Sequence, residues 1–165
     1  LALIAGLAGF LIVPADLLWS IQAPRDDVNI ARFDAGSVNM RSAFLNPYPP
    51  SSATAFAYNY GYAFLRLKLP ILFDFGLPEI ALTLYSSLAA LLCLWAVSLR
   101  SPQSLLLGSL FLAHDLPLIL FEPDLGSYFR HLSSVAPYLL PGILALDQRR
   151  RKSMPTVTAA PDCSR

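Results

Sequence analysis

The sequence predicts an all-α transmembrane protein with about four membrane-spanning helices and a long outer loop between the first and the second. Two properties of the composition support this class: mean hydropathy is +0.53 and only 14% of residues are charged, against about 25% in a typical soluble domain. Residues 80–99 contain no charged side chain and are long enough to cross a hydrocarbon core of about 30 Å. A soluble helix of that length would normally show a polar face.

The first predicted span covers residues 1–21, with Trp19 where an interfacial anchor is expected. Pro24 and Arg25 are expected to end this helix. The chain begins at Leu1 inside an apolar stretch without a preceding basic region. Residues 1–21 are therefore not expected to form a complete signal peptide, and a fragment or a processed chain is expected.

Residues 24–76 mix charged, amide and proline residues and are predicted to form an outer loop with short local structure. Prolines at positions 47, 49 and 50 exclude a long helix around them. The remaining predicted spans are residues 79–99, 104–121 and 128–146, joined by a tight turn at 100–103 and an acidic turn at 122–127.

The predicted orientation follows from the basic cluster at residues 149–152, directly after the last span. Basic residues flanking a span favour the cytoplasm, so the C-terminus is expected there. Counting back places Arg100 inside and the loop 24–76 outside. The predicted domains are a polytopic membrane domain at 1–147 and a tail at 148–165 that is basic and then disordered.

Several function classes are disfavoured. The net charge of +1 gives no basic field for nucleic acid. Cys93 lies in an apolar run and Cys163 in the tail, neither beside a metal-ligand residue. Phosphate-loop, zinc-protease and paired-cysteine motifs are absent, so no metal site is predicted from a motif.

His114 and Asp115 are polar residues in the middle of the third predicted span. A charge at that depth costs at least ~2.5 kcal/mol and usually faces a cavity or a partner. The expected partner is Arg130 or His131, and an intramembrane relay in a small transporter is one possible use. The alternative is a wet kink beside Pro117 without function.

Acidic and basic residues also flank the outer turn: Glu122 and Asp124 on one side, Arg130 and His131 on the other. They are expected to form a salt bridge between helices. Alternatively, Arg130 and His131 bind a phosphate group, for which arginine is well suited.

The aromatic residues of 56–64 alternate strictly with small or amide residues. Period two predicts a strand with all five rings on one face, where Tyr58 and Tyr60 would contact a sugar. The alternative is an interfacial aromatic belt. Arg66 and Lys68 follow and are expected to extend toward the membrane surface.

Asp26 and Asp27 follow the first predicted span on the outer side. Carboxylates in such a place can act as a general base or hold a divalent cation. The alternative is that they are the solvated end of a helix.

The order of these features resembles the N-terminal half of polytopic GT-C-type glycosyltransferases that use polyprenyl-phosphate sugars. The carrying features are Asp26 or Asp27 after a first span, Asn46-Pro47-Tyr48, Phe56-x-Tyr58 and the Leu/Pro-rich entry 69–78 into an apolar span. The ending Gly126 to His131, before a proline-containing span and a basic tail, looks like the C-terminus of envelope polysaccharide enzymes. The chain departs from that family in having far fewer spans, and Tyr58-Asn59-Tyr60 replaces the usual Tyr-Pro-Pro.

The resemblance implies inverting sugar transfer, with Asp26 or Asp27 as base or cation ligand and a lipid-linked sugar as donor. Arg130 and His131 would hold the donor phosphate. Membrane lipids and other membrane subunits are the remaining expected partners. The competing hypothesis is a non-catalytic integral membrane subunit that binds or scaffolds a larger complex.

Overall fold

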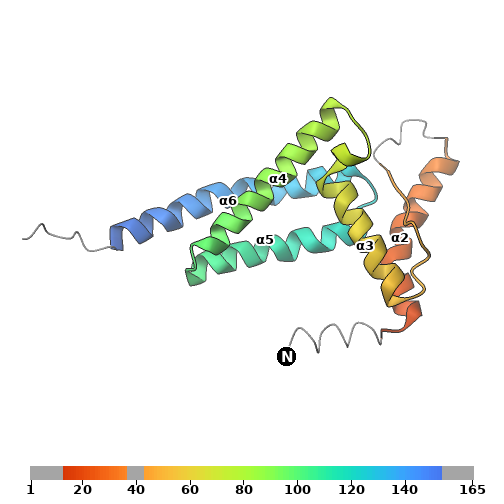
Figure 1. Ribbon diagram of the computed structural model, residues 1–165, viewed down its shortest axis with the longest axis horizontal. Helices are drawn as coiled ribbons and strands as arrows, with labels where there is room; N and C mark the ends of the chain where they lie inside the picture. Colours follow the sequence, from red (N-terminus) through yellow and green to blue (C-terminus); the bar gives the residue numbers. More distant parts are fainter. Residues whose placement is uncertain (1–12, 37–42, 154–165) are drawn as a thin grey trace, which may run out of the picture.

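The computed structural model describes residues 13–36 and 43–153, which form α-helices and one short 3-10 helix and contain no strand. The all-α prediction is therefore confirmed for this part of the chain. The α-helices are α2 (Ala15–Asp34), α3 (Ala53–Lys68), α4 (Leu77–Ser98), α5 (Pro102–Phe121) and α6 (Leu125–Ser153), and the 3-10 helix is η1 (Pro70–Leu72). Helices α5 and α6 run roughly along the long axis of the molecule, α4 packs on both of them obliquely, and α2 and α3 gather at one end (Figure 1).

Helices α4 and α5 are both long and apolar enough to cross a membrane. They match the predicted spans 79–99 and 104–121, and a tight turn joins them as expected. In this turn Arg100 adopts a left-handed backbone conformation with φ of 53°. Ser101 and Ser104 then form a reciprocal capping box that satisfies backbone donors at the start of α5.

Small residues let the three long helices approach closely. A Cβ atom added to Gly108 of α5 would lie 2.9 Å from the Val97 side chain of α4. A Cβ atom added to Gly142 of α6 would lie 2.9 Å from the Leu107 side chain of α5. Cys93 is buried beside Gly108, as expected of a small apolar residue. This use of glycine is typical of helix contacts in membranes.

Helix α6 covers the fourth predicted span and continues to Ser153, into the residues expected to form the tail. The first predicted span lies partly outside the described residues, because only residues 13–21 are placed. Helix α2 begins at Ala15 and does not end at Pro24, as the sequence suggested. It continues to Asp34 because buried side chains on both sides of Pro24 anchor it to the rest of the protein.

The predicted outer loop 24–76 is largely helical, since it contains the second half of α2, all of α3 and η1. The prediction of a strand at 56–64 is wrong, because these residues lie in α3. The Ser52 hydroxyl accepts a hydrogen bond from the Ala55 backbone N–H and caps this helix. The buried positions 56, 59, 63 and 67 follow helical spacing, which outweighs the period-two pattern of the rings.

The segment 43–50 is not helical, in agreement with its prolines, and it contacts α2 and the turn before α6. Ala43 forms an antiparallel bridge with Asp124. The side-chain amide of Asn29 on α2 donates hydrogen bonds to the backbone oxygens of Phe44 and Pro123, at 2.8 and 2.7 Å. One buried amide therefore joins α2, the segment 43–50 and the turn between α5 and α6.

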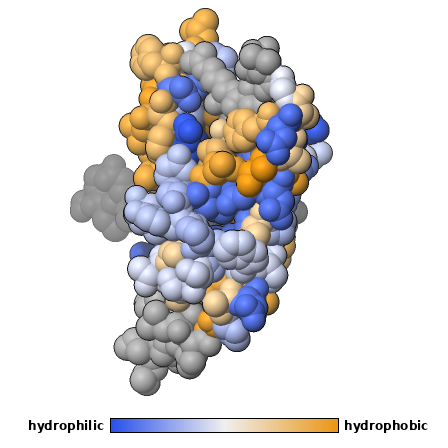
Figure 2. Space-filling model, turned by 90° about the vertical axis from the view of Figure 1, so that its right-hand side faces the viewer, coloured by the Kyte–Doolittle hydropathy of each residue, from blue (hydrophilic) through white to orange (hydrophobic). Residues whose placement is uncertain are grey.

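Figure 2 shows this end of the molecule, where hydrophilic and apolar residues alternate on the surface. The buried face of α2 is mostly polar and includes Gln22, Arg25 and Asn29. Large apolar side chains of the same helix, including Trp19 and Phe33, are exposed. Helix α2 thus buries several polar side chains while it exposes several large apolar ones.

Asp124 caps α6 and pairs with Arg32 of α2. Its side chain accepts a hydrogen bond of 2.8 Å from the Ser127 backbone N–H and forms an ion pair with Arg32. Burial acts to raise the pKa of Asp124, but the bonds from Ser127 and Arg32 outweigh it and hold this pKa below its ordinary value of 3.8. The ionised form of the Asp124 side chain therefore stabilises the folded protein.

We expect Asp124→Asn to keep the helix cap and lose the ion pair, whereas Asp124→Ala loses both and is about 1 kcal/mol less stable than Asp124→Asn. A carboxyl whose pKa is lowered by folding stabilises the protein above its unfolded pKa and loses this effect as pH falls through its folded pKa. The difference in thermal midpoint between the unmodified chain and Asp124→Asn, measured in detergent, should be present at pH 7, decline as pH falls below 3.8 and vanish once the pH is below the folded pKa, which is lower than 3.8. A difference that persists there would contradict this role of the charge.

Candidate functional site

Asp26 and Asp27 line a surface cavity of about 240 Å³. The cavity lies between α2 and the segment 43–50. Two aromatic residues, Trp19 and Tyr48, share its wall with the two acids. Its remaining lining residues are Ala23, Ile30, Leu45, Asn46, Pro49 and Pro50.

The two acids differ in their surroundings. Asp26 is half-buried and accepts hydrogen bonds from the Asn46 backbone N–H at 2.9 Å and from the Asn46 side-chain amide at 3.0 Å. Asp27 is exposed. Asp26 therefore positions the segment 43–50, whereas Asp27 is the carboxylate that is more accessible to a ligand.

Arg25 of α2 also holds the segment 43–50 in place, from the buried side of that segment. Its guanidinium is buried, donates to the Ile119 backbone oxygen at 3.2 Å and to the Asn46 side-chain oxygen, and lies 4.8 Å from the centre of the Phe44 ring. Desolvation lowers the pKa of Arg25, and the nearby charge of Asp26 partly opposes this effect. The Arg25 Nε atom is buried without a hydrogen-bond partner among the described residues.

Tyr48 is held by a network of buried amides. Asn59 of α3 donates to the Tyr48 backbone oxygen at 2.7 Å and accepts from the Tyr48 backbone N–H at 3.2 Å. The Asn59 amide also donates to the Gln22 side-chain oxygen at 3.0 Å. The position of the Tyr48 ring in the cavity is therefore set by α2 and α3 together.

The two tyrosines predicted to bind substrate point to different places. Tyr58 packs edge-to-face on Tyr48, with ring centres 5.0 Å apart, and so lies next to the cavity. The Tyr60 hydroxyl instead donates to the Leu116 backbone oxygen of α5 at 3.2 Å. The helical form of α3 separates the two rings that a strand would have aligned.

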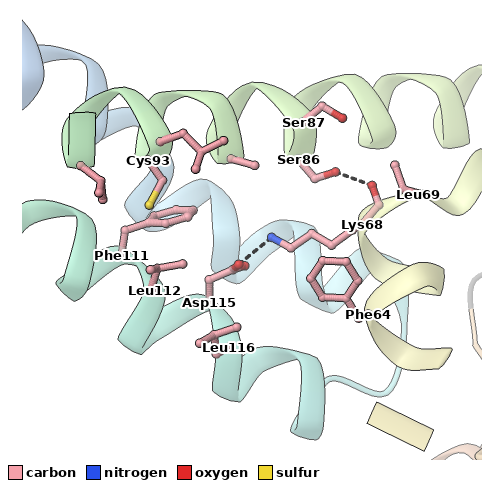
Figure 3. A pocket seen from close by; sticks show the side chains of 13 residues that line it. Phe64, Lys68, Leu69, Ser86, Ser87, Cys93, Phe111, Leu112, Asp115 and Leu116 are labelled. Carbon is pink, nitrogen blue, oxygen red and sulfur yellow. Dashed lines mark hydrogen bonds and ion pairs between the residues drawn. The ribbon is translucent and has the colours of Figure 1, made fainter. Parts of the chain in front are cut away.

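A second polar centre lies among α3, α5 and α6. Lys68 forms an ion pair of 2.6 Å with Asp115, and the Tyr128 hydroxyl donates to the other oxygen of Asp115 at 2.8 Å. The Lys68 and Asp115 side chains are only 10% and 5% exposed. The Ser86 hydroxyl of α4 donates to the Lys68 backbone oxygen at 2.6 Å (Figure 3).

This arrangement corrects two expectations. Asp115 is paired with Lys68 and Tyr128, and not with Arg130 or His131. Lys68 is buried against α5 and does not extend to the surface. The sequence contained one signal that Asp115 needs a partner, namely its place in the middle of an apolar span, because a buried charge requires one. Lys68 lies before the preceding apolar span, 47 positions away, so the sequence did not identify it as that partner.

The pair borders an apolar groove of about 560 Å³ between α3, α4 and α5. Figure 3 shows Lys68 and Asp115 at this groove, with Phe64, Phe111, Leu112 and Leu116 around them. The complete lining is Phe64, Lys68, Leu69, Ser86, Ser87, Ala90, Cys93, Leu94, Val97, Phe111, Leu112, Asp115 and Leu116.

The residues around the outer turn form two separate ion pairs. His131 contacts the Glu122 carboxylate, and this contact is a salt bridge when the histidine is protonated, whereas Asp124 pairs with Arg32 instead of Arg130. His114 lies with its Nε2 atom 3.4 Å from the His131 backbone oxygen.

Arg130 is exposed. Neither Arg130 nor His131 lines the cavity that contains Asp26 and Asp27. The acids and the two basic residues predicted to hold the donor phosphate are therefore in different parts of this end.

Within residues 13–36 and 43–153, His, Cys, Asp and Glu side chains form no group of three that could hold a metal ion. A divalent cation at Asp26 and Asp27 would have to take its remaining ligands from water or substrate, as Mg²⁺ often does.

Comparison of the chain with known protein families, with characterised proteins and with solved structures gave no significant match.

We expect removal of either partner of the buried pair to destabilise the protein strongly, because the other charge remains buried without compensation. Lys68→Met and Asp115→Leu should each cost about 3–5 kcal/mol, and the double variant should cost much less than their sum. Asp74→Asn is the control, because the Arg66–Asp74 pair of 3.5 Å is more exposed and should contribute only about 0–1 kcal/mol. Unfolding in detergent micelles measures all four variants, and additive effects would contradict direct coupling of Lys68 and Asp115.

Proposed function

We propose that the chain is a multi-pass membrane protein that forms all or part of an envelope glycosyltransferase, transferring a sugar from a polyprenyl-phosphate donor. One observation carries this proposal: Asp26 and Asp27 share a cavity with Trp19 and Tyr48. Aromatic rings can pack on the apolar face of a sugar. Carboxylates can accept hydrogen bonds from its hydroxyl groups or remove a proton.

In the proposed reaction, Asp27 takes the proton of an acceptor hydroxyl. The acceptor oxygen then forms a bond to the anomeric carbon, and the bond from that carbon to the phosphate oxygen breaks. Polyprenyl phosphate leaves with the electron pair, and the anomeric configuration is inverted. Asp26 acts indirectly in this scheme, because it holds Asn46 and the wall of the cavity.

The orientation of the chain follows the charge rule. The cavity lies at the end of the bundle where α6 begins, because Ala43 bridges Asp124 beside the start of that helix. Helix α6 ends in the basic residues 149–152. If the basic end is cytoplasmic, the cavity faces the outer side. Arg130 and His131 near the start of α6 lie at the same end but outside the cavity, and we propose that they hold the phosphate of a donor whose sugar extends to Asp27.

A non-catalytic membrane subunit is the second candidate. It is favoured by the structural use of Asp26 and by apolar side chains exposed on α2, outside the two helices apolar enough to span a membrane. These side chains are Leu17, Trp19, Val28, Ile30 and Phe33. Such a surface suits a partner protein as well as lipid.

The test uses the full chain in vesicles, supplied with polyprenyl-phosphate mannose or polyprenyl-phosphate glucose and a membrane extract as the source of acceptor. We expect Asp27→Asn to lower sugar transfer about 10²–10⁴-fold, the usual contribution of a general base. Asp26→Asn should lower both transfer and thermal stability. Asp16→Asn is the matched control, because Asp16 is an exposed acid of α2 outside the cavity. This variant should transfer sugar at the rate of the unmodified chain.

Full transfer by a folded Asp26→Asn, Asp27→Asn double variant would exclude the proposed base. Absence of transfer in the unmodified chain, together with isolation of a stoichiometric complex with other membrane proteins, would favour the subunit.

A further inference from the structure

We propose that the cavity between α2 and the segment 43–50 binds a quaternary alkylammonium group, the cation of choline and of choline head groups. This inference goes beyond sugar transfer and does not require it, because binding depends only on the lining of the cavity. A ligand of this kind would occupy the space proposed for the sugar acceptor and would compete with it. Three features of the lining point to this class of ligand: its charge, its aromatic rings and its few free hydrogen-bonding groups.

The lining of the cavity is negatively charged. Its charged residues are Asp26 and Asp27, and no basic residue of the part of the chain that the structure describes lines it. Asp26 accepts two hydrogen bonds from Asn46 and lies near the charge of the buried Arg25. None of the ion pairs among the described residues involves Asp27. The exposed Asp27 carboxylate is therefore available to a cation, and the lining disfavours an anion inside the cavity.

Aromatic rings from two separate elements line the same cavity. Trp19 and Asp27 lie about two turns apart on α2 and both line it, so this helix supplies a ring together with a carboxylate. Tyr48 comes from the non-helical segment, and the edge-to-face contact with Tyr58 supports its ring. The electron-rich face of an aromatic ring attracts a cation, and tryptophan does so most strongly. Two rings beside a carboxylate are the combination that recognises an organic cation.

The rest of the lining contains few free hydrogen-bonding groups. The Asn46 side chain is occupied, because it donates to Asp26 and to a backbone oxygen of α2 and accepts from Arg25. The other lining residues are apolar, namely Ala23, Ile30, Leu45, Pro49 and Pro50. A primary ammonium has several donors to satisfy and a metal ion needs several oxygen ligands. A quaternary ammonium has no donor and presents methyl groups, so it suits these walls better than either.

The test is equilibrium dialysis of the full chain, in a detergent without choline, against radiolabelled choline. Unlabelled choline should displace the label. Dimethylbutanol, the neutral isostere with a carbon atom in place of the ammonium nitrogen, should require a concentration at least roughly tenfold higher. The two compounds have the same shape, so the difference measures recognition of the charge. This comparison uses the unmodified chain and is informative even if a variant fails to fold.

Two pairs of matched variants locate the bound choline. Trp19→Ala should weaken choline binding by roughly 3- to 30-fold, the range of one cation–π contact. Trp95→Ala is its control, because Trp95 is an exposed residue of α4 outside the cavity. Asp27→Asn should also weaken binding, and this difference should shrink as added salt screens the exposed carboxylate. Asp16→Asn is its control, and both controls should bind choline as tightly as the unmodified chain.

Three results would overturn the inference: no binding of choline, equal displacement by choline and dimethylbutanol, or unchanged choline binding by a folded Trp19→Ala variant. Where choline does bind, repeating the dialysis in phosphatidylglycerol bilayers with and without phosphatidylcholine identifies the source of the cation. Loss of choline binding when phosphatidylcholine is present identifies a lipid head group as the ligand. Unchanged binding identifies a soluble choline compound.

The outcomes also separate this inference from the proposed function. Choline binding by a chain that transfers no sugar would leave the cation site intact and exclude the glycosyltransferase. Sugar transfer by a chain that does not bind choline would overturn the cation site and leave the glycosyltransferase intact.

Discussion

The ion pair of Lys68 and Asp115 is the interaction on which the arrangement of helices most depends. It joins α3 to α5, and through the Tyr128 hydroxyl and the Ser86 hydroxyl it also engages α6 and α4. Burying a single charge would be prohibitive, so these groups must meet for the helices to pack. The pair therefore determines the position of α3 on the bundle, and that position creates one wall of the apolar groove.

A related constraint organises the other end of α3 and the whole of α2. The segment 43–50 lacks helical hydrogen bonds, so its backbone groups need partners. Asn29 of α2 and Asn59 of α3 supply them with side-chain amides. This explains why the buried face of α2 is polar, and it explains how Asp26 and Asp27 come to lie beside Trp19 and Tyr48. The cavity therefore forms because α2 and α3 provide hydrogen-bond partners for the backbone groups of the segment 43–50.

Helix α3 links the two candidate sites. Its N-terminal half carries Asn59, which positions Tyr48 in the cavity, and its last residue is Lys68 at the groove. A displacement of α3 would thus affect both places. Residues of this one helix therefore contribute to both places, although the groove and the cavity share no lining residue.

The sequence by itself determined the elements whose signal is local. The apolar runs specify α4 and α5, and the prolines at 47, 49 and 50 keep their segment out of a helix. The sequence also identified Asp26 and Asp27 as candidate carboxylates, but it did not predict the cavity that they line. The sequence also indicated that Asp115 needs a partner. These properties depend on the residues of one short segment, and hydropathy or backbone geometry is sufficient to read them.

Only the tertiary structure decided the identity of that partner, the continuation of α2 past Pro24 and the helical form of residues 56–64. Lys68 and Asp115 are 47 positions apart, and Arg25 and Ile119 are 94 positions apart. Periodicity within a segment contains no information about such contacts. The aromatic pattern at 56–64 satisfies a strand as well as a helix, and the burial of Asn59 and Ala63 against distant residues selects the helix. Each of these outcomes depends on the pairing of buried polar groups between segments that are remote in the chain.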